Sequence, residues 1–438
     1  MPELTTLRLG LQLRNGSQFG ISFQAGGMSS STCMNSRIAI IGAGLSGLAL
    51  ALALHKNGFT NITIYELRPA SLDIGGAIML SPNALRILDA LDVYYQLRLR
   101  SYEFDTDNAM TPVDTFEFGS ASKYGYQALR VYRYELIEVL HNLTQEKDGI
   151  FINYDKKFAR ITSETSKEVT WSFTDDTQAS TSFLIGADGI HSQVRKYLYP
   201  DLVPRFTKGI GVTAAVPTAQ LQLPEGLSTP LTFMNNDHGA FVITKQLHDG
   251  SEVLIGKQRR FTDNLDKDGW ADLLNNKQWC IDFLRQGASD FPPVVSNAVS
   301  NISKERINLW PFYIVPKLNT WVSERGNVVI LGDAAHAIPP TAGQGVKQAF
   351  EDVYTFAGVL GALEKQHTES GHTSRRNEIF KRWQIGRQAR IDKVLELNAM
   401  IDKRRLPNQD SYEIQKGEFD LNWLYNIDFE RTISEWAV

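Results

Sequence analysis

The amino-acid sequence predicts an α/β protein in which a parallel sheet is accompanied by a second, antiparallel sheet. Three observations lead to this fold class. First, an apolar strand at 37–41 runs through a glycine-rich turn into an apolar helix. Second, two later apolar strands, at 181–186 and 327–332, each end beside an aspartate. Third, the hydrophobic pattern between 208 and 258 changes to that of short alternating strands. The chain has 438 residues, 42% of them hydrophobic, which suits two packed units or one large two-lobed domain.

The composition excludes several classes of protein. The charges are interspersed and the formal net charge is -4, so we expect no binding to nucleic acid. Two cysteines, Cys33 and Cys280, cannot form a disulfide framework or a four-thiolate metal site, so we expect no metal and a cytoplasmic protein. No apolar run is long enough to span a bilayer. Residues 1–35 lack the apolar segment of a secretory signal and are expected to form a flexible leader, whose arginines and serines leave organelle targeting open.

The turn after the first strand carries Gly42, Gly44 and Gly47 in the spacing G-x-G-x-x-G. The first glycine allows a tight turn, the second lets a pyrophosphate approach the backbone, and the third brings the helix close to the strand. The helix ends near Gly58, and a second strand closes on Glu66, 24 residues after Gly42. An acid at that strand end accepts hydrogen bonds from a ribose. These features predict a dinucleotide site without deciding between NAD and FAD.

The middle of the chain adds a second glycine pair and a further strand end. Gly75 and Gly76 provide a flexible approach to the next strand, and Arg133 begins a helical pattern, where an ordinary solvated charge is the simpler interpretation. Residues 151–189 alternate as a β-meander whose last strand runs to Asp188. Because ligands gather at the carboxyl ends of parallel strands, we expect Asp188 to lie near the first glycine turn.

The segment GDAAHAIPPTAGQGVKQAFED, residues 332–352, is the least generic part of the sequence. Asp333 ends an apolar strand and can accept hydrogen bonds from hydroxyl groups. The glycines of 341–345 start a helix whose N-terminal amides and positive dipole end are open to a ligand. An acid for a sugar alcohol and a positive helix end suit a flavin ring with its ribitol, because the reduced ring is anionic.

Three segments together resemble the signatures of the class A flavoprotein monooxygenases, the family of para-hydroxybenzoate and salicylate hydroxylases, particularly its fungal members. They are the glycine turn with its helix and strand (42–66), GADGIHSQVR (186–195) and GDAAHAIPPTAGQGVKQAFEDVYTFA (332–357), and the resemblance covers the chain from about residue 36 to its end. It implies a Rossmann-type FAD-binding domain of the GR2-like kind, an inserted antiparallel-sheet substrate domain and C-terminal helices.

The resemblance also implies a discontinuous division of the chain. After the leader, 1–35, the FAD-binding domain would consist of 36–76, 120–205 and 316–400, the substrate domain of 77–119 and 206–315, and a C-terminal segment of 401–438.

FAD contacts can be carried over to the positions that match the family's motifs. The first glycine turn would cradle the pyrophosphate, and Glu66 would hold the adenosine ribose. Asp188 would serve both FAD and nicotinamide, and Asp333 would take the ribitol or pyrophosphate side. His336 looks catalytic by its type, but the family uses this position to shape the turn, so the resemblance implies a structural role. The full set implied for FAD is Gly42, Gly44, Gly47, Glu66, Gly76, Ala77, Arg133, Asp188, Asp333, Gly343, Gln344, Gly345 and Val346, of which the last four would line the flavin pyrimidine.

The implied activity is that of an FAD-dependent monooxygenase. NADPH or NADH would be a transient reductant, O2 the oxidant, and a flavin C4a-hydroperoxide would hydroxylate a small aromatic, polycyclic or other electron-rich molecule. A monomer or a homodimer is expected. Three alternatives stay open: an epoxidase, Baeyer–Villiger or indole oxidase of a natural-product pathway on the same frame; a flavin amine oxidase or NAD dehydrogenase; and a binding protein that has kept the fold but lost the flavin.

The substrate side is less defined by the sequence. Where phenol hydroxylases of this family often carry an arginine or tyrosine, the first strand of the inserted sheet has VTAA (212–215), which argues against a simple phenolic acid. The remaining candidates are His238, Lys245, Trp310 and Tyr313. We predict His238 and Tyr313 as catalytic, although a hairpin residue and a pocket wall are their ordinary interpretations.

Overall fold

The computed structural model describes residues 34, 36–70, 76–104, 106–109, 116–263, 265–365, 372–405 and 419–438. The chain divides into two compact units, Met1–Thr32 and Cys33–Val438, and all the described residues belong to the second unit. Nearly all of the predicted leader therefore lies outside the described residues.

A five-stranded parallel sheet lies in the first hydrophobic core, with the strand order β18-β12-β1-β2-β8. These strands are β1 Ile38–Ile41, β2 Ile62–Tyr65, β8 Ile150–Asn153, β12 Phe183–Gly186 and β18 Val328–Ile330. Every residue of β1, β12 and β18 is buried, as expected for parallel strands covered on both faces. The predicted α/β class is confirmed.

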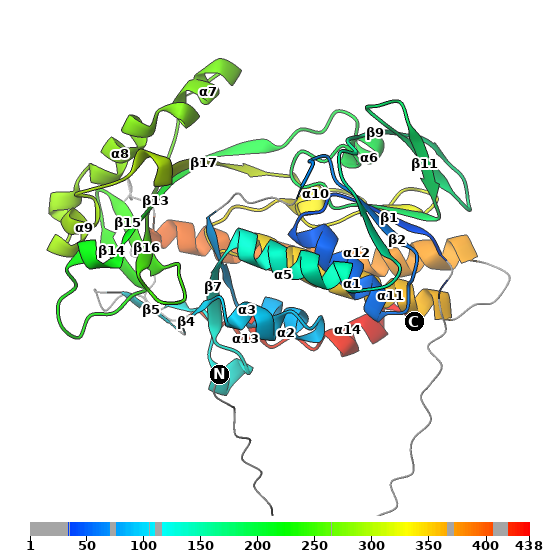
Figure 1. Cartoon of the computed structure of the whole chain (residues 1–438), viewed down its shortest axis with the longest axis horizontal. Coiled ribbons are helices and arrows are strands. Elements are labelled where there is room, and N and C mark those ends of the chain that lie inside the picture. Colours follow the sequence, from blue (N-terminus) through cyan, green and yellow to red (C-terminus); the bar gives the residue numbers. More distant parts are fainter. Residues whose placement is uncertain are drawn as a thin grey trace, which may run out of the picture. The chain divides into compact units, whose positions relative to one another are not determined.

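Three helices pack together beside this sheet: α1 (Leu45–Lys56), α5 (Arg133–Gln145) and α11 (Gly345–Lys365). Figure 1 shows α1 next to both of the others, and it contacts both. α1 is buried on nearly every side because its sequence, LSGLALALALHK, is apolar all round. It ends where the sequence predicts, since Gly58 follows with a φ of +99°.

The predicted β-meander of 151–189 is only partly right. β9 (Phe158–Glu164), β10 (Val169–Phe173) and β11 (Gln178–Thr181) form a separate three-stranded antiparallel sheet. The two flanking strands, β8 and β12, join the parallel sheet instead. For β12 the physical reason is visible in its sequence, FLIG, which is apolar without alternation and so suits burial on both faces.

A seven-stranded sheet, called the large sheet below, surrounds the second hydrophobic core and has the order β17-β13-β16-β15-β14-β5-β6. Its strands are β5 Thr106–Ala109, β6 Phe116–Glu117, β13 Arg205–Pro217, β14 Leu231–Asn235, β15 Gly239–Lys245, β16 Glu252–Arg260 and β17 Ile307–Ile314. The prediction that the four strands β13, β14, β15 and β16 form antiparallel pairs is confirmed. One face is covered by α7 (Lys267–Asn275), α8 (Lys277–Arg285) and α9 (Pro293–Ala298), grouped in Figure 1.

A three-stranded sheet, called the small sheet, pairs β7 (Ala128–Tyr132) with β3 (Ala77–Leu80) and with β4 (Tyr102–Phe104). At the end of β7, the Tyr132 hydroxyl donates to Glu252 of the large sheet and accepts from Gln246 at 3.1 Å. The small sheet therefore reaches the large sheet through this tyrosine.

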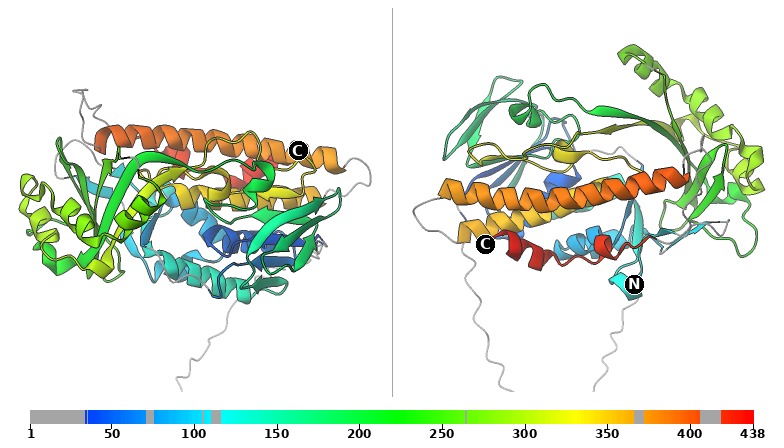
Figure 2. Two further views of the ribbon diagram at one scale, coloured as in Figure 1. Left: turned by 90° about the horizontal axis from the view of Figure 1, so that it is seen from above. Right: turned by 180° about the vertical axis from the view of Figure 1, so that it is seen from behind.

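The remaining helices lie along the first core and at element ends. α12, His372–Arg405, is the longest helix of the described chain and lies alongside α11, as Figure 2 shows. The others are α2 Pro82–Ala90, α3 Tyr94–Arg98, α4 Ala121–Tyr124, α6 Arg195–Leu198, α10 Asp333–His336, α13 Asn422–Tyr425 and α14 Phe429–Trp436. Within the described ranges, no helix combines the length and the hydrophobicity needed to cross a membrane. The predicted boundaries between domains stay predictions.

Candidate functional site

The first glycine turn connects β1 to α1 and leaves open space above its middle residue. Gly42 has a φ of +107°, and a Cβ at Gly47 would lie 1.9 Å from the carbonyl oxygen of Gly42. A Cβ at Gly44, in contrast, would meet no atom within 4 Å. The fold itself therefore requires the outer two glycines, whereas Gly44 faces an open space at the N-terminus of α1, where backbone amides attract phosphate.

Two other strand ends lie against this turn. A Cβ at Gly42 would lie 2.7 Å from the carbonyl oxygen of Ala187, just after β12. A Cβ at Gly332, just after β18, would lie 3.1 Å from the hydroxyl oxygen of Ser46 in α1. The three motifs, far apart in the sequence, therefore meet at the carboxyl edge of the parallel sheet, where open α/β sheets bind their ligands.

Glu66 connects the end of β2 to the glycine turn. Its carboxylate is buried and accepts from the backbone N–H of Ala43 at 2.9 Å through one oxygen, and from the backbone N–H of Arg68 at 3.0 Å through the other. An ionised carboxylate offers about four acceptor positions. Glu66 is thus fixed in place and still has capacity to accept from the hydroxyl groups of a ribose.

Asp188 has one occupied and one free carboxylate oxygen. Oδ2 accepts from the backbone N–H groups of Gln193 at 2.7 Å and Val194 at 3.2 Å. Oδ1 is buried without a hydrogen-bond partner, and burial raises the pKa of this carboxyl group. The neighbouring Gly189 has a φ of +76° and no atom within 4 Å of a Cβ position. An unpartnered acceptor beside open backbone is the arrangement that a hydroxyl-bearing ligand completes.

Asp333 and Arg133 lie close enough for their charges to interact. Both side chains have exposed surface, yet burial raises the pKa of Asp333 and lowers the pKa of Arg133. Exposed surface together with a pKa perturbed by burial is expected of a side chain that lines a deep cleft in the protein. Each also perturbs the pKa of the other by charge attraction, and the backbone N–H of Arg133 donates to the carbonyl of Gly76 at 3.3 Å. Gly76, which has no atom within 4 Å of a Cβ position, therefore leaves open space next to Arg133.

The start of α11 also has open backbone positions. Gly343 has a φ of +61°, and a Cβ at Gly345 would meet no atom within 4 Å. Gln344 is buried and accepts from the side-chain amide of Asn83 at 3.3 Å, while Val346 is half-buried. The first amides of a 21-residue helix thus face open space, and their partial positive charge would stabilise an anion there.

His336 lies behind the cleft in a buried ionic network. Its Nε2 shares a hydrogen bond with Asp352, which also accepts from the backbone N–H of Gly332 at 2.8 Å and from Arg387 at 2.7 Å. Arg387 also pairs with Glu351, and both carboxylates are fully buried. These bonds hold the turn after β18 against α11, so the geometry indicates that His336 has a structural role.

Sequence reasoning missed two cations at this site, Arg130 of β7 and Lys347 of α11. Lys347 is fully buried, and its Nζ has no hydrogen-bond partner. Burial and repulsion by Arg130 lower the pKa of Lys347 to about 7. Burial also lowers the pKa of Arg130 to about 10, and its Nε is buried without a partner. The local sequence could not have placed these two residues at the site, because each looks like an ordinary charged residue in its own segment. Their position depends on the pairing of distant segments.

Lys347→Met is expected to stabilise the protein, most strongly at acidic pH. Below about pH 7 the lysine is charged in both the folded and the unfolded state, so folding bears the full cost of burying the charge. Between pH 7 and the ordinary value of 10.5, the unfolded chain binds a proton that the folded protein has released, so wild-type stability rises with pH. The gain should be on the order of 1–4 kcal/mol near pH 6 and smaller near pH 9.

The measurement is the Tm of wild type and variant at both pH values. Lys257→Met is the matched control, because Lys257 is also buried but donates to the carbonyls of Gln286 at 2.7 Å and Phe283 at 3.4 Å. That variant should lose stability, since two buried acceptors lose their donor. A lower Tm for Lys347→Met at pH 6 would contradict the expectation.

The two residues predicted to be catalytic lie on the large sheet and its hairpin. The His238 Nε2 contacts Asp290 at 2.8 Å, and the ring packs on Phe291 at 6.2 Å, within the segment that follows α8. Tyr313 of β17 is half-buried, with its ring 5.5 Å from that of Phe206 on β13. These contacts agree with the ordinary interpretations of a hairpin residue and a wall residue, and a catalytic role for either stays a prediction.

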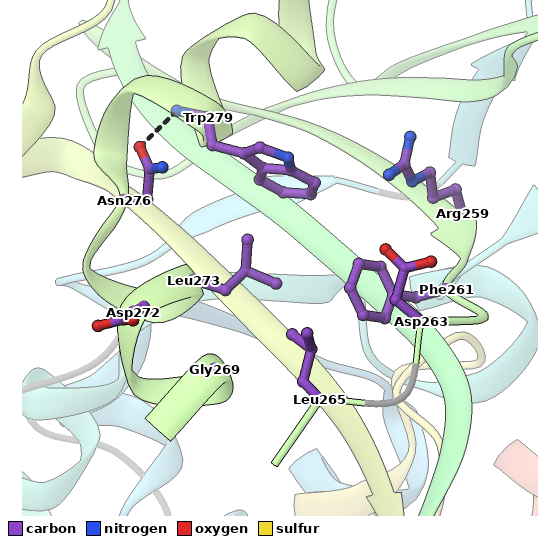
Figure 3. A pocket seen from close by; sticks show the side chains of 9 residues that line it. All are labelled: Arg259, Phe261, Asp263, Leu265, Gly269, Asp272, Leu273, Asn276 and Trp279. Atoms are coloured by element: carbon purple, nitrogen blue, oxygen red, sulfur yellow. Dashed lines mark hydrogen bonds between the residues drawn. The ribbon is translucent and has the colours of Figure 1, made fainter. Parts of the chain in front are cut away.

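A second hollow of about 290 Å³ lies among the helices of the large sheet, as Figure 3 shows. It shares no residue with the glycine turns. Its lining residues are Arg259, Phe261, Asp263, Leu265, Gly269, Asp272, Leu273, Asn276 and Trp279. Arg259 stacks over the Trp279 ring at 5.5 Å, which accounts for the position of that guanidinium. None of the residues assigned to FAD therefore lines this hollow.

The residues of the cleft fit FAD. The open positions at Gly44, Gly76 and Gly345 leave room where a Cβ would intrude on a bound dinucleotide. The carboxylate of Glu66 and the unpartnered oxygen of Asp188 can accept hydrogen bonds from the hydroxyl groups of FAD. Within the described residues, no group of three or more His, Cys, Asp or Glu side chains could hold a metal ion.

Comparison with known proteins agrees with this geometry. A family model described as an FAD binding domain matches residues 35–276 and 316–383, more than half of the chain. A salicylate hydroxylase of Pseudomonas putida is 27% identical over 445 residues, which cover 91% of this chain and 94% of that protein. The 6-methylsalicylate 1-monooxygenase atA of Aspergillus terreus is 25% identical over 421 residues, with 90% of each chain covered.

The fold has solved counterparts. The crystal structure of CtdE in complex with FAD and substrate matches with a TM-score of 0.71 and 18% identity, covering 92% of this chain and 97% of that one. At this identity the likeness concerns the fold alone. The family match over most of the chain, together with relatives that align along nearly their whole length, shows that the chain belongs to the FAD-binding-domain family as an FAD-dependent monooxygenase of the para-hydroxybenzoate and salicylate hydroxylase type.

Proposed function

We propose that this monooxygenase uses NADPH or NADH together with O2 to place one oxygen atom on an electron-rich carbon of a small aromatic or polycyclic molecule. The observation that supports it best is the meeting of the three motifs at one edge of the parallel sheet, with backbone left open at Gly44, Gly189 and Gly345. A binding protein that had lost the flavin would have no need to keep these three positions free of side chains.

In this proposal the chain supplies orientation and charge, while bound FAD supplies the redox chemistry that activates O2. The turn at Gly44 and the start of α1 bind the pyrophosphate, and Glu66 binds the adenosine ribose. Asp333 accepts from the ribitol, with Arg133 across the cleft. The amides of Gly345 and Val346 direct partial positive charge at the flavin pyrimidine. The nicotinamide reductant binds transiently near Asp188, since the sequence has no second G-x-G-x-x-G turn.

The direct test is reductant consumption in the presence of candidate substrates. Purified protein reconstituted with FAD should oxidise NADPH or NADH faster when a phenol, indole or polyketide-like aromatic is added, with matching O2 uptake and a product heavier by one oxygen atom. Protein that stays colourless after incubation with FAD would contradict the proposal.

A second candidate is a different oxygen insertion on the same frame: epoxidation, Baeyer–Villiger insertion or indole oxidation. The observation in its favour is the absence of charged side chains from residues 211–215 of β13, where Thr213 and Ala215 stand on the opposite face to the buried Val212 and Ala214. The position of the added oxygen in the product, read by mass spectrometry and NMR, separates these outcomes from aromatic hydroxylation.

Asp333→Ala and Glu66→Ala are each expected to weaken FAD retention without unfolding the chain. Hydrogen bonds to a charged group contribute roughly 1.5–3 kcal/mol, so each variant should bind FAD about tenfold to hundredfold more weakly. Flavin content after gel filtration and a titration of apoprotein measure this effect. Asp263→Ala, which removes an exposed aspartate from the separate hollow, is the control. Unchanged flavin content in both site variants would refute these assignments.

A further inference from the structure

One face of the small sheet points toward the large sheet. Along β7, Leu129 and Val131 are buried in the first core, so Arg130 and Tyr132 stand on the opposite face. Tyr132 contacts the large sheet through Glu252. Arg130, two residues earlier on the same face, therefore faces the space between the two sheets.

Arg130 has neighbours that define this wall. By the strand register it pairs with Met79 of β3 on one side and with Tyr102 of β4 on the other. The Tyr102 ring is covered by the ammonium group of Lys245, on the large sheet, at 4.9 Å. Tyr102, across the strand from Arg130, and Tyr132, two residues along β7, thus connect the small sheet to the large one.

The same wall meets the start of α11. The methyl carbon of Met79 lies 3.1 Å from the position that a Cβ at Gly343 would occupy, and the Nζ of Lys347 lies 3.8 Å from that position. Lys347 and Arg130 are close enough for their charges to repel each other. Two cations, one from β7 and one from the first turn of α11, therefore converge beside the glycine turn that opens onto the cleft.

Neither cation is neutralised by the protein. Lys347 Nζ and Arg130 Nε are buried without hydrogen-bond partners, and neither residue forms an ion pair within the described part of the chain. Other buried cations here are satisfied: Arg387, for example, pairs with both Glu351 and Asp352. Two like charges held together in a dry site are costly unless an anion completes them.

On the large sheet, the stretch 211–215 of β13 offers an anion no charged partner. On β13 the residues that face away from the helices are Gly211, Thr213 and Ala215, and Gly256 of β16 lies next to Thr213. An anionic group between the two sheets would find its charge-assisted donors on the small sheet and α11 instead.

We propose that Arg130 and Lys347 form a subsite for an anionic group of the substrate, a carboxylate, phenolate or enolate held from the wall opposite to β13. This rests on the proposed function. Arg130 keeps some exposed surface, so we assign the direct hydrogen bonds to its guanidinium, while the fully buried Lys347 adds positive charge. The substrate, rather than the ionised ring of reduced flavin, is the anion because Arg130 lies on the wall that continues through Tyr132 to the large sheet.

The test uses FAD-loaded protein in the oxidised state, in which the flavin ring is neutral. Benzoate and thiocyanate are titrated into wild type, Arg130→Met and Lys347→Met, and the change in the visible spectrum of bound FAD gives each dissociation constant. Benzamide serves as the neutral ligand and Lys257→Met as the control for a buried lysine. The midpoint potential of bound FAD is measured for each protein.

Saturable binding of an anion to wild type, weakened about tenfold to hundredfold in both site variants but not in Lys257→Met, would support the subsite. Benzamide affinity should be the same in all four proteins. Absence of saturable anion binding to wild type, or equal affinities in wild type and variants, would overturn it. A lowered FAD midpoint potential with unchanged anion affinity would assign the cations to the flavin and would also overturn it. Wild-type protein unable to hold FAD at all would count against the proposed function instead.

Discussion

Gly44→Val is expected to yield a folded protein that no longer retains FAD. A Cβ at this position meets no protein atom within 4 Å, and Gly44 has an ordinary extended conformation with a φ of -79°, so the chain accommodates the side chain without strain. The valine would instead fill the space in which we propose that the backbone amides of α1 bind the pyrophosphate. Loss of two hydrogen bonds to a charged group, at roughly 1.5–3 kcal/mol each, weakens FAD binding by at least about a hundredfold.

Gly47→Ala, three residues away, is the matched comparison and should fail for a different reason. Its Cβ would lie 1.9 Å from the carbonyl oxygen of Gly42, so α1 must move away from β1. We expect poor folding, seen as a lowered Tm of the apoprotein, whereas Gly44→Val should leave the apoprotein Tm close to that of wild type. Normal FAD content in Gly44→Val would refute the position of the pyrophosphate.

Arg387→Leu is expected to destabilise the protein by about 3–5 kcal/mol, because it removes the cation from a fully buried ion-pair network. Glu351 and Asp352 would remain buried with a single guanidinium, that of Arg390, bonded to Glu351 at 2.6 Å. Burial alone would raise the pKa of Glu351, but Arg390 and Arg387 lower it to about 2.

The same network gives the wild type a defined acid sensitivity. Since the folded pKa of Glu351 is below its ordinary value of 4.5, its contribution to stability is present above pH 4.5 and is lost as the pH falls toward 2.

The loss of stability in Arg387→Leu is measured as the change in the midpoint of urea unfolding at neutral pH, followed by tryptophan fluorescence. Arg382→Leu on the same helix is the control, because Arg382 pairs with Glu378 at only 3.9 Å near the surface and should cost less than about 1 kcal/mol. Equal losses in the two variants would contradict the role of the network.

The parts of the site that the sequence predicted are those built from backbone geometry. Gly42 and Gly47 are demanded by contacts of a tight strand-to-helix turn, and Asp333 follows a short apolar strand, so local pattern and spacing were sufficient for them. The fold class followed for the same reason, since apolar strands without alternation can only be covered on both faces.

The parts that the sequence did not reveal depend on pairing between distant segments. Arg130 acquires its orientation from strands centred about fifty and thirty residues earlier in the chain. Lys347 reads as a surface lysine until α11 is placed under the small sheet. On α12, nothing local distinguishes the buried Arg387 from the more accessible Arg390 three residues on, because both lie in a uniformly charged helix. The strand β8 was misassigned for a related reason, as its partner β2 lies nearly ninety residues away.

The unpartnered ammonium group of Lys347 has a consequence for laboratory evolution. Selection for heat resistance alone would favour apolar replacements at this position, because they remove a charge that the fold does not neutralise. Thermostable variants obtained in that way would gradually lose their preference for acidic over neutral compounds. Directed evolution for thermal stability should therefore keep Lys347 unchanged and select stabilising substitutions on the solvent-facing side of α12.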